Sequence, residues 1–200
     1  MSWTRLFELG DLTLTLPLAS ALAAGLLAAR DRRGAISLAL LFALALGIVG
    51  VGKVAFLGWG TGIPVLDFKA PSGHAAGVSA LFPALLYLLL RHGPAPWRTA
   101  AVAAGIALGA LVAGLLVHAD EHTPAEAWAG WAVGCAASLA TIRLAGPRPA
   151  PRPFAGLACG LIVFCAVAWA MQRAHVGYWM IKVALALSGN ERPFPWDSCS

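Results

Sequence analysis

Six apolar runs, each about as long as a lipid bilayer is thick, take up most of this 200-residue chain. A membrane-spanning helix needs about 20 mostly apolar residues. With 60% hydrophobic and only 12% charged residues, the composition argues against a water-soluble globular protein. We therefore expect an all-α, polytopic membrane protein with six transmembrane helices. The predicted spans are residues 12–29, 35–56, 74–90, 99–117, 126–142 and 154–171.

The distribution of basic residues predicts how these spans are oriented. Cytoplasmic loops of membrane proteins are enriched in Lys and Arg. Eight of the 14 basic residues lie in connections that face one side, where Asp31 is the only acid. That side is expected to be cytoplasmic, with both termini on the outer side, so the net charge of +5 calls for no nucleic-acid partner. The eight residues are Arg30, Arg32, Arg33, Arg91, Arg98, Arg143, Arg148 and Arg152.

The chain is expected to form a single membrane-embedded domain over residues 1–200. Its longest interruption between spans, residues 57–73, contains the run Gly-Trp-Gly-Thr-Gly-Ile-Pro (58–64) and is predicted to be irregular near the outer interface. The tail, 172–200, has a short apolar stretch around 178–187. Trp179 and Trp196 suit anchoring at a membrane interface, so the tail is predicted to lie there.

Small side chains within the spans have structural explanations. Glycines recur in the fourth and fifth spans, where they let helices approach closely. These are Gly105, Gly109, Gly114, Gly130 and Gly134. Three of the four cysteines are expected to act as small apolar residues inside spans, and the fourth is isolated, so no disulfide framework is predicted. They are Cys135, Cys159, Cys165 and Cys199.

Polar residues gather at the outer ends of three spans. Ionisable residues at membrane depth are costly and call for an explanation. The set comprises Lys53, Lys69, Ser72, Gly73, His74, His118, Asp120, Glu121, His122 and Glu126. Three helix ends are therefore predicted to converge on one site.

The stretch Pro-Ser-Gly-His, residues 71–74, indicates a helix start that suits an anion. Ser72 is a favourable N-cap, and Gly73 leaves the backbone open to close approach. The free N–H groups and partial positive charge of a helix N-terminus bind phosphate readily. Lys53 or Lys69 would add a full positive charge, and His74 would donate a proton to a leaving oxygen.

His122 and Glu126 have the spacing that sets a carboxylate behind an imidazole. Such a carboxylate fixes the ring tautomer and leaves the other nitrogen free to attack phosphorus. Thr123-Pro-Ala-Glu126 also matches a capping box with proline at the first helical position, and we expect capping and orientation to compete for one carboxylate. A divalent metal held by His118 and His122, with carboxylates between and after them, is the alternative.

These residues resemble the type 2 phosphatidic acid phosphatase superfamily of membrane lipid phosphatases. The family pattern is a lysine followed seven residues later by Arg-Pro, then Pro-Ser-Gly-His, then Ser-Arg, five residues, His, three residues and Asp. The six-helix plan extends the resemblance over most of the chain, and we expect no metal and no cofactor. The resemblance implies a nucleophile, His122, a general acid, His74, and an orienting acid, Glu126. Phosphate ligands would be Lys53, Ser72 and Gly73. Outside the family pattern, Lys69 or a protonated His118 is expected to add positive charge.

The chain departs from that pattern at three places. Gly60-Thr61 stands where Arg-Pro is expected, Leu115-Leu116 stands where Ser-Arg is expected, and Glu126 replaces Asp. A guanidinium that binds phosphate through two hydrogen bonds is not easily replaced by lysine. If the third motif is aligned correctly, Leu116→Arg is expected to raise activity.

The sequence thus predicts a phosphoric ester or anhydride hydrolase that acts on a lipid phosphate through a phosphohistidine. Polyprenyl diphosphate or phosphatidic acid would be the substrate class, reached from the periplasmic face of a bacterial inner membrane. Two alternatives stay open. One is a phosphatase-like protein that binds or transports lipids without hydrolysis, and the other is a phosphotransferase that passes the phosphate to a second acceptor.

Overall fold

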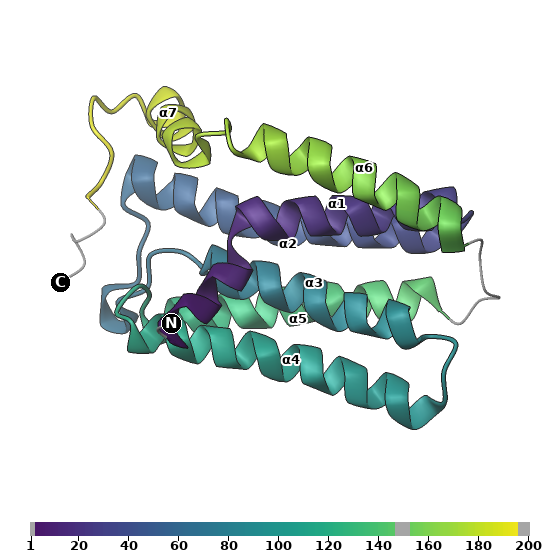
Figure 1. Cartoon of the computed structure of the whole chain (residues 1–200). Helices are drawn as coiled ribbons and strands as arrows, with labels where there is room; N and C mark the ends of the chain where they lie inside the picture. The colour runs from purple at the N-terminus through teal and green to yellow at the C-terminus, as the bar shows by residue number, and fades with distance from the viewer. Residues whose placement is uncertain (1–2, 147–152, 196–200) are drawn as a thin grey trace.

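The chain folds as a bundle of helices, in the computed structural model that describes residues 3–146 and 153–195 (Figure 1). Among these residues the nearest thing to a strand is an isolated bridge between Ile63 and Phe68, so the predicted all-α class is confirmed. Arg148, Arg152, Trp196 and Cys199 lie outside the described residues. The elements are η1 (Trp3–Gly10), α1 (Leu12–Ala28), α2 (Arg32–Trp59), η2 (Pro64–Leu66), α3 (Gly73–Leu90), α4 (Ala95–His118), α5 (Pro124–Ala145), α6 (Pro153–Met171) and α7 (Val176–Ser188).

Each of the six predicted spans contains one helix, and the differences lie at the ends. Helix α2 continues through Trp59, beyond the predicted end at residue 56, and stops where Gly60 adopts a left-handed conformation with φ 64°. Helix α4 starts at Ala95, before the predicted residue 99, because Pro94 and Pro96 suit a helix start. The apolar stretch of the tail is itself a helix, α7, which packs against α2.

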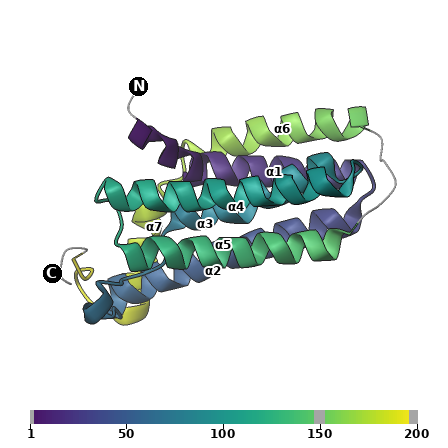
Figure 2. The same ribbon diagram turned by 90° about the horizontal axis from the view of Figure 1, so that it is seen from below.

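Helix α3 is the centre of the bundle. It packs most extensively against α5 and α4, and it also contacts α1, α2 and η1. Helix α6 lies at the edge, beside α1, as both ribbon views show (Figure 2). The helix that begins with the Pro-Ser-Gly-His stretch is therefore held on several sides.

Glycines of α4 and α5 allow this close packing, chiefly against α3, and Gly109 of α4 also lies against Trp131 of α5. Gly105 and Gly109 of α4 lie against α3, and so do two glycines of α5. A Cβ atom on Gly130 would lie 2.3 Å from the carbonyl oxygen of Ser72, and one on Gly134 would lie 2.5 Å from that of Ala76. Contacts this short leave room for glycine alone, so these residues fix the distance between α5 and the start of α3.

We expect Gly130→Ala to lower the stability of the protein by about 1–3 kcal/mol, the usual cost of overpacking a core. The reason is that the added methyl group meets rigid backbone rather than a side chain that can move aside. Thermal unfolding in detergent measures the effect. Gly114→Ala is the matched control, since a Cβ there meets nothing within 4 Å. Equal unfolding temperatures for the two variants would contradict the packing argument.

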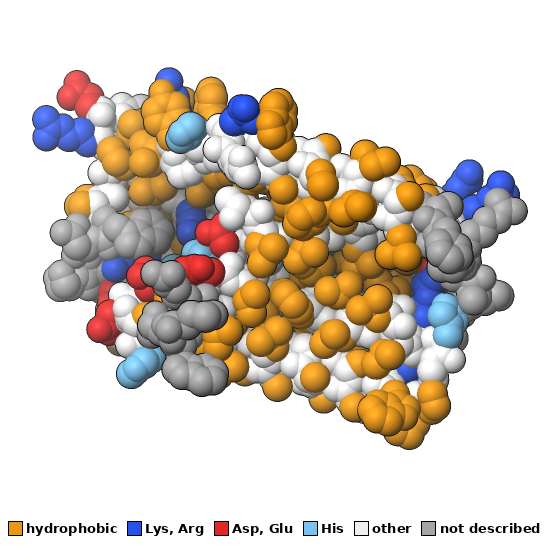
Figure 3. Space-filling model, viewed as in Figure 1, with side chains coloured by type: hydrophobic (Ala, Val, Ile, Leu, Met, Phe, Trp, Pro, Cys, Tyr) orange, Lys and Arg blue, Asp and Glu red, His pale blue; other side chains and the backbone are white. Residues whose placement is uncertain are grey.

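The surface of the bundle is that of an integral membrane protein. Hydrophobic side chains cover its middle, and charged side chains gather towards the two ends (Figure 3). By length and composition, α2, α3 and α4 can each cross a membrane, and α6 with α7 can form a fourth span bent by 61°. Helix α1 is apolar but shorter, and α5 does not meet this criterion within the described residues. The six-span topology therefore stays a prediction.

The arginine-rich end of the bundle includes a buried ion pair. Arg91, at the end of α3, donates to the carboxylate of Asp31, and each residue is only 4% exposed. Asp31 also caps α2 by accepting the N–H of Gly34 at 3.0 Å. The charge of Arg91 is thus balanced inside the fold, and the polar cluster lies at the opposite end.

Candidate active site

The turn between α4 and α5 brings His122 next to Glu126. Helix α4 ends as the N–H groups of Glu121 and His122 both donate to the carbonyl of Leu116, and Asp120 takes a left-handed conformation with φ 55°. Nδ1 of His122 then lies 2.8 Å from Oε2 of Glu126, as predicted from their spacing. A carboxylate only accepts, so Nδ1 carries the hydrogen and Nε2 presents a lone pair. No side-chain or backbone partner of Nε2 occurs in the described part of the chain.

Glu126 caps its helix and orients His122 at the same time, so the expected competition is wrong. Oε2 accepts the N–H of Thr123 at 3.4 Å as well as the imidazole, and the N–H of Glu126 donates to Thr123 in return. Oε1 accepts the N–H of Lys69 at 3.1 Å. The residue is 2% exposed. Two oxygens with four lone-pair positions can serve all three donors, and burial strengthens each bond.

Helix α3 begins as the sequence predicts, with Ser72 as its N-cap. The Ser72 hydroxyl accepts the N–H of Ala75 at 3.4 Å, and the Ser72 N–H donates to the carbonyl of Glu126 at 2.9 Å. Ser72 is fully buried, so its polar groups serve the fold. The N–H groups of Gly73 and His74 donate no hydrogen bond to any described residue, and these are the groups that an incoming anion would meet.

Two lysines approach this helix start from different directions. Nζ of Lys53, on α2, lies 4.0 Å from the position that a Cβ on Gly73 would take, and its charge interacts with that of Glu126. Nζ of Lys69, on the loop before α3, lies 3.7 Å from Oδ1 of Asp67. The structure thus brings Lys53 and Lys69 to the same end as Gly73 and Glu126.

His74 occupies the first turn of α3 and is about one-third exposed. Its charge interacts with those of His122 and Lys53, so the two predicted catalytic histidines lie within electrostatic reach of each other. Nε2 of His74 lies 3.8 Å from Oδ2 of Asp11, a residue for which sequence reasoning predicted no role.

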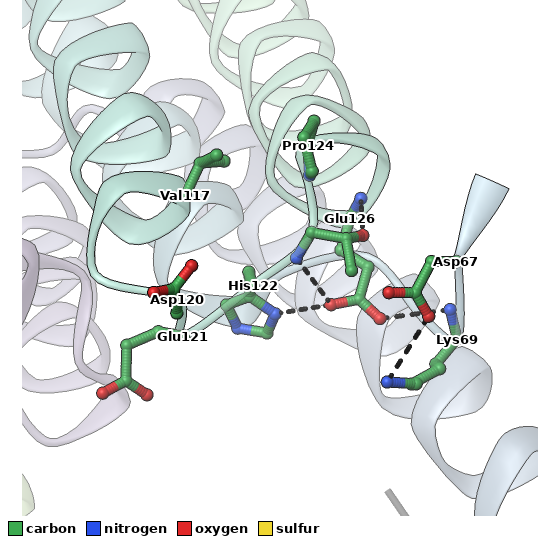
Figure 4. Close-up of a pocket in the computed structure, with 9 residues that line it drawn as sticks. Asp67, Lys69, Val117, Asp120, Glu121, His122, Pro124 and Glu126 are labelled. Atoms are coloured by element: carbon green, nitrogen blue, oxygen red, sulfur yellow. Dashed lines mark hydrogen bonds and ion pairs between the residues drawn. The ribbon is translucent and has the colours of Figure 1, made fainter. Parts of the chain in front are cut away.

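A pocket of about 370 Å³ opens beside His122 (Figure 4). Figure 4 shows the imidazole, the Glu126 carboxylate and the Lys69–Asp67 pair side by side at its wall. The lining residues are Asp67, Lys69, Val117, Asp120, Glu121, His122, Thr123, Pro124 and Glu126. Asp67 was missed by the sequence analysis, because nothing in its neighbourhood marks it before the loop folds it towards Lys69.

The metal alternative has no geometric counterpart in the described residues. There, no group of three or more His, Cys, Asp or Glu side chains comes together as metal ligands. His118 is exposed at the end of α4 and has no partner among those residues that would hold it next to His122.

Comparisons with known proteins agree with the residues of the site. The sequence model of the PAP2 superfamily matches residues 55–150, which include the start of α3 and the His122–Glu126 pair. The chain is also similar to a Klebsiella pneumoniae protein described as "Uncharacterized 22.5 kDa protein in cps region", with 33% identity over 97% of this chain and 95% of that one. The chain belongs to the PAP2 superfamily. This confirms the resemblance drawn from its motifs, and no solved structure matches the chain.

The fold leaves no room for the two PAP2 arginines at the aligned positions. Gly60 has φ 64°, and a Cβ there would lie 2.8 Å from the ring of Phe194. Leu116 is 1% exposed, packed with Val112, Ala127 and other apolar residues between α3, α4 and α5. Neither position can therefore supply a guanidinium group to the pocket.

We expect Leu116→Arg to unfold the protein partly or fully, contrary to the sequence-based expectation of higher activity. An unpaired charge left in the core costs about 3–5 kcal/mol, a large share of the stability of a domain. Thermal unfolding in detergent measures it. Leu116→Met, which keeps the volume, is the control and should cost less than about 1.5 kcal/mol. A Leu116→Arg protein that is as stable as the wild type and releases more phosphate would show that the arginine reaches the pocket.

Proposed function

We propose that this PAP2 protein is a membrane lipid phosphatase that hydrolyses a phosphate or pyrophosphate group on a lipid through a phosphohistidine. The observation that carries the proposal is the His122–Glu126 pair, 2.8 Å apart with Glu126 buried, at the wall of a pocket near unbonded N–H groups of α3. The pair supplies an oriented nucleophile, and the helix start supplies an anion site.

In the first step, Nε2 of His122 attacks phosphorus and the bond from phosphorus to the leaving oxygen breaks. That oxygen is the lipid hydroxyl oxygen of a phosphate monoester or the bridging oxygen of a diphosphate. His74 gives its proton to that leaving oxygen. Glu126 accepts the Nδ1–H of His122 and stabilises the positive charge that the ring acquires. In the second step, water attacks the phosphohistidine, His74 takes the proton from that water, and His122 leaves as a neutral imidazole.

The negative charge on the phosphate oxygens is balanced by positive groups in this proposal. The N–H groups of Gly73 and His74 point along the helix axis, where they and the helix dipole stabilise oxygens of the transition state. The ammonium groups of Lys53 and Lys69 take the place of the two arginines. Ser72 acts through its capping of α3, because both its hydroxyl and its N–H are already bonded.

We further propose that the substrate is a polyprenyl diphosphate or a phosphatidic acid whose tails stay in the bilayer. The pocket lies at the end of the bundle opposite the arginine-rich connections, so its head-group site would face the periplasm across a bacterial inner membrane. The whole chain would act as one unit, because the site takes residues from α2, α3, α5 and the loops between them.

Gly60 and Leu116, which stand where the family pattern has arginines, leave no room for an arginine side chain. This favours one other candidate, a protein that binds or transports a lipid phosphate without hydrolysing it. Phosphate release by the purified protein in detergent separates the two functions. The panel holds phosphatidic acid, a polyprenyl phosphate and a polyprenyl diphosphate, each with and without chelator. Release that survives the chelator supports the phosphatase. A folded protein that retains these lipids on gel filtration but releases no phosphate would replace it with the binding protein.

A further inference from the structure

The N-terminal segment folds back over His74. The 3₁₀-helix η1 packs against α3 and α4, and the ring of Phe7 meets the His74 imidazole edge-on with centroids 6.1 Å apart. Gly10 lies directly on the backbone of His74, since a Cβ on Gly10 would come within 2.3 Å of the His74 carbonyl oxygen. A segment that is distant in sequence therefore defines the surroundings of the imidazole.

Asp11 lies at the junction of η1 and α1. One of its carboxylate oxygens caps α1, and the other faces His74. Oδ1 accepts the N–H and the hydroxyl of Thr13 at 2.7 and 2.6 Å and so caps α1. Oδ2 lies 3.8 Å from Nε2 of His74. Burial raises the pKa of the Asp11 carboxyl, but the Thr13 hydrogen bonds and the nearby His74 outweigh it and hold the pKa below its ordinary value. The carboxylate is therefore charged where it faces the imidazole.

The other charged groups around His74 differ in sign and position. Lys53 approaches from α2 and His122 from the turn before α5, and both disfavour a positive charge on His74. Glu121, in the same turn as His122, favours it. Among the described residues, Asp11 is the acid that comes within ion-pair distance of the ring. Burial of the ring also disfavours its charged form, so Asp11 opposes these effects in part.

We propose that Asp11 is a positioning residue that holds His74 in the orientation and protonated form from which it donates to the leaving oxygen. This inference rests on the proposed phosphatase function and adds the N-terminal segment to the machinery of the site. Asp11 acts through His74 and touches no reacting atom. The bond changes are those of the phosphatase steps: the proton passes from His74 to the lipid oxygen as the bond from phosphorus to oxygen breaks.

The variant that isolates this role is Asp11→Asn. Asparagine is as good an N-cap as aspartate, so the amide oxygen can still accept from Thr13 while the negative charge is lost. A general acid matters most for a poor leaving group. We expect a loss of about 10-fold or more in kcat for phosphatidic acid and less than about 3-fold for p-nitrophenyl phosphate, whose leaving group needs little protonation. Glu8→Gln, which neutralises an exposed acid of η1, should match the wild type on both substrates.

NMR of histidine-labelled protein gives a readout that does not depend on turnover. The ring resonances of His74 should change in Asp11→Asn and stay in place in Glu8→Gln. Equal losses on the two substrates, or no loss on either, would overturn the positioning role. A wild type that hydrolyses neither substrate would overturn the phosphatase and the role in turnover together, and the NMR spectra would then decide separately whether Asp11 holds His74.

Discussion

His122→Ala is expected to reduce phosphate release to background, a loss on the order of 10⁶-fold as for removal of the nucleophile of a hydrolase. Alanine has no atom that can form the covalent intermediate, and water would have to attack the lipid phosphate directly. Initial rates of phosphate release on the best lipid of the panel measure the effect. The side chain is one-tenth exposed, so unfolding temperatures should accompany the rates.

His175→Ala is the matched control for this experiment. His175 is an exposed histidine that precedes α7, and its ring contacts a backbone carbonyl of its own turn. Its removal should leave both the rate and the stability unchanged. A folded His122→Ala protein that keeps a tenth or more of the wild-type rate would exclude His122 as the nucleophile.

The second large effect is expected for Glu126→Gln, with kcat falling on the order of 10⁴-fold, as when an amide replaces the acid of a catalytic triad. The glutamine amide oxygen can still accept the N–H of Lys69, whereas its NH₂ replaces the oxygen that accepts the N–H of Thr123, so that capping bond is lost. The amide NH₂ would then face His122 and donate to Nδ1. The ring would be held with its hydrogen on Nε2, the nitrogen that has to attack. Rates and unfolding temperatures together separate this tautomer effect from a loss of folding.

Glu121→Gln serves as the control, because Glu121 lines the same pocket but is exposed and bonds through its backbone alone in the described residues. It should lose far less activity than Glu126→Gln, because Glu121 acts on His74 only through its charge. If Glu126→Gln stays stable and as active as Glu121→Gln, then Glu126 has a structural role only.

Local signals in the sequence predicted the elements and part of the site. The lengths of the apolar runs predicted the six helices, and Ser72 predicted where α3 begins. The four-residue spacing of His122 and Glu126 predicted that their side chains form a hydrogen-bonded pair. Each of these depends on residues close together in the chain. The end of α2 was missed by three residues because Gly58 can continue a helix when α7 packs on it.

What the sequence could not predict depends on distant contacts. Asp11 and Asp67 are ordinary loop acids until folding places them beside His74 and Lys69. The glycines of α5 indicated close packing, but their partner, α3, follows only from the arrangement of the bundle. Likewise, whether Leu116 points to the pocket or to the core cannot be read from a motif alignment.

Glu126 has a further consequence for the motions of the site. Its side chain holds the Lys69 N–H and the start of α5, while its carbonyl holds the Ser72 N–H at the start of α3. Breaking any one of these hydrogen bonds weakens the others, because all of them involve Glu126. The loop before α3, the first turn of α3 and the first turn of α5 therefore form one cooperative unit of local unfolding. The protein therefore has no low-energy fluctuation that frees His122 alone. The pocket end either keeps the His122–Glu126 geometry or opens as a whole, and the backbone amides of Lys69, Ser72 and Thr123 should then exchange hydrogen with solvent together.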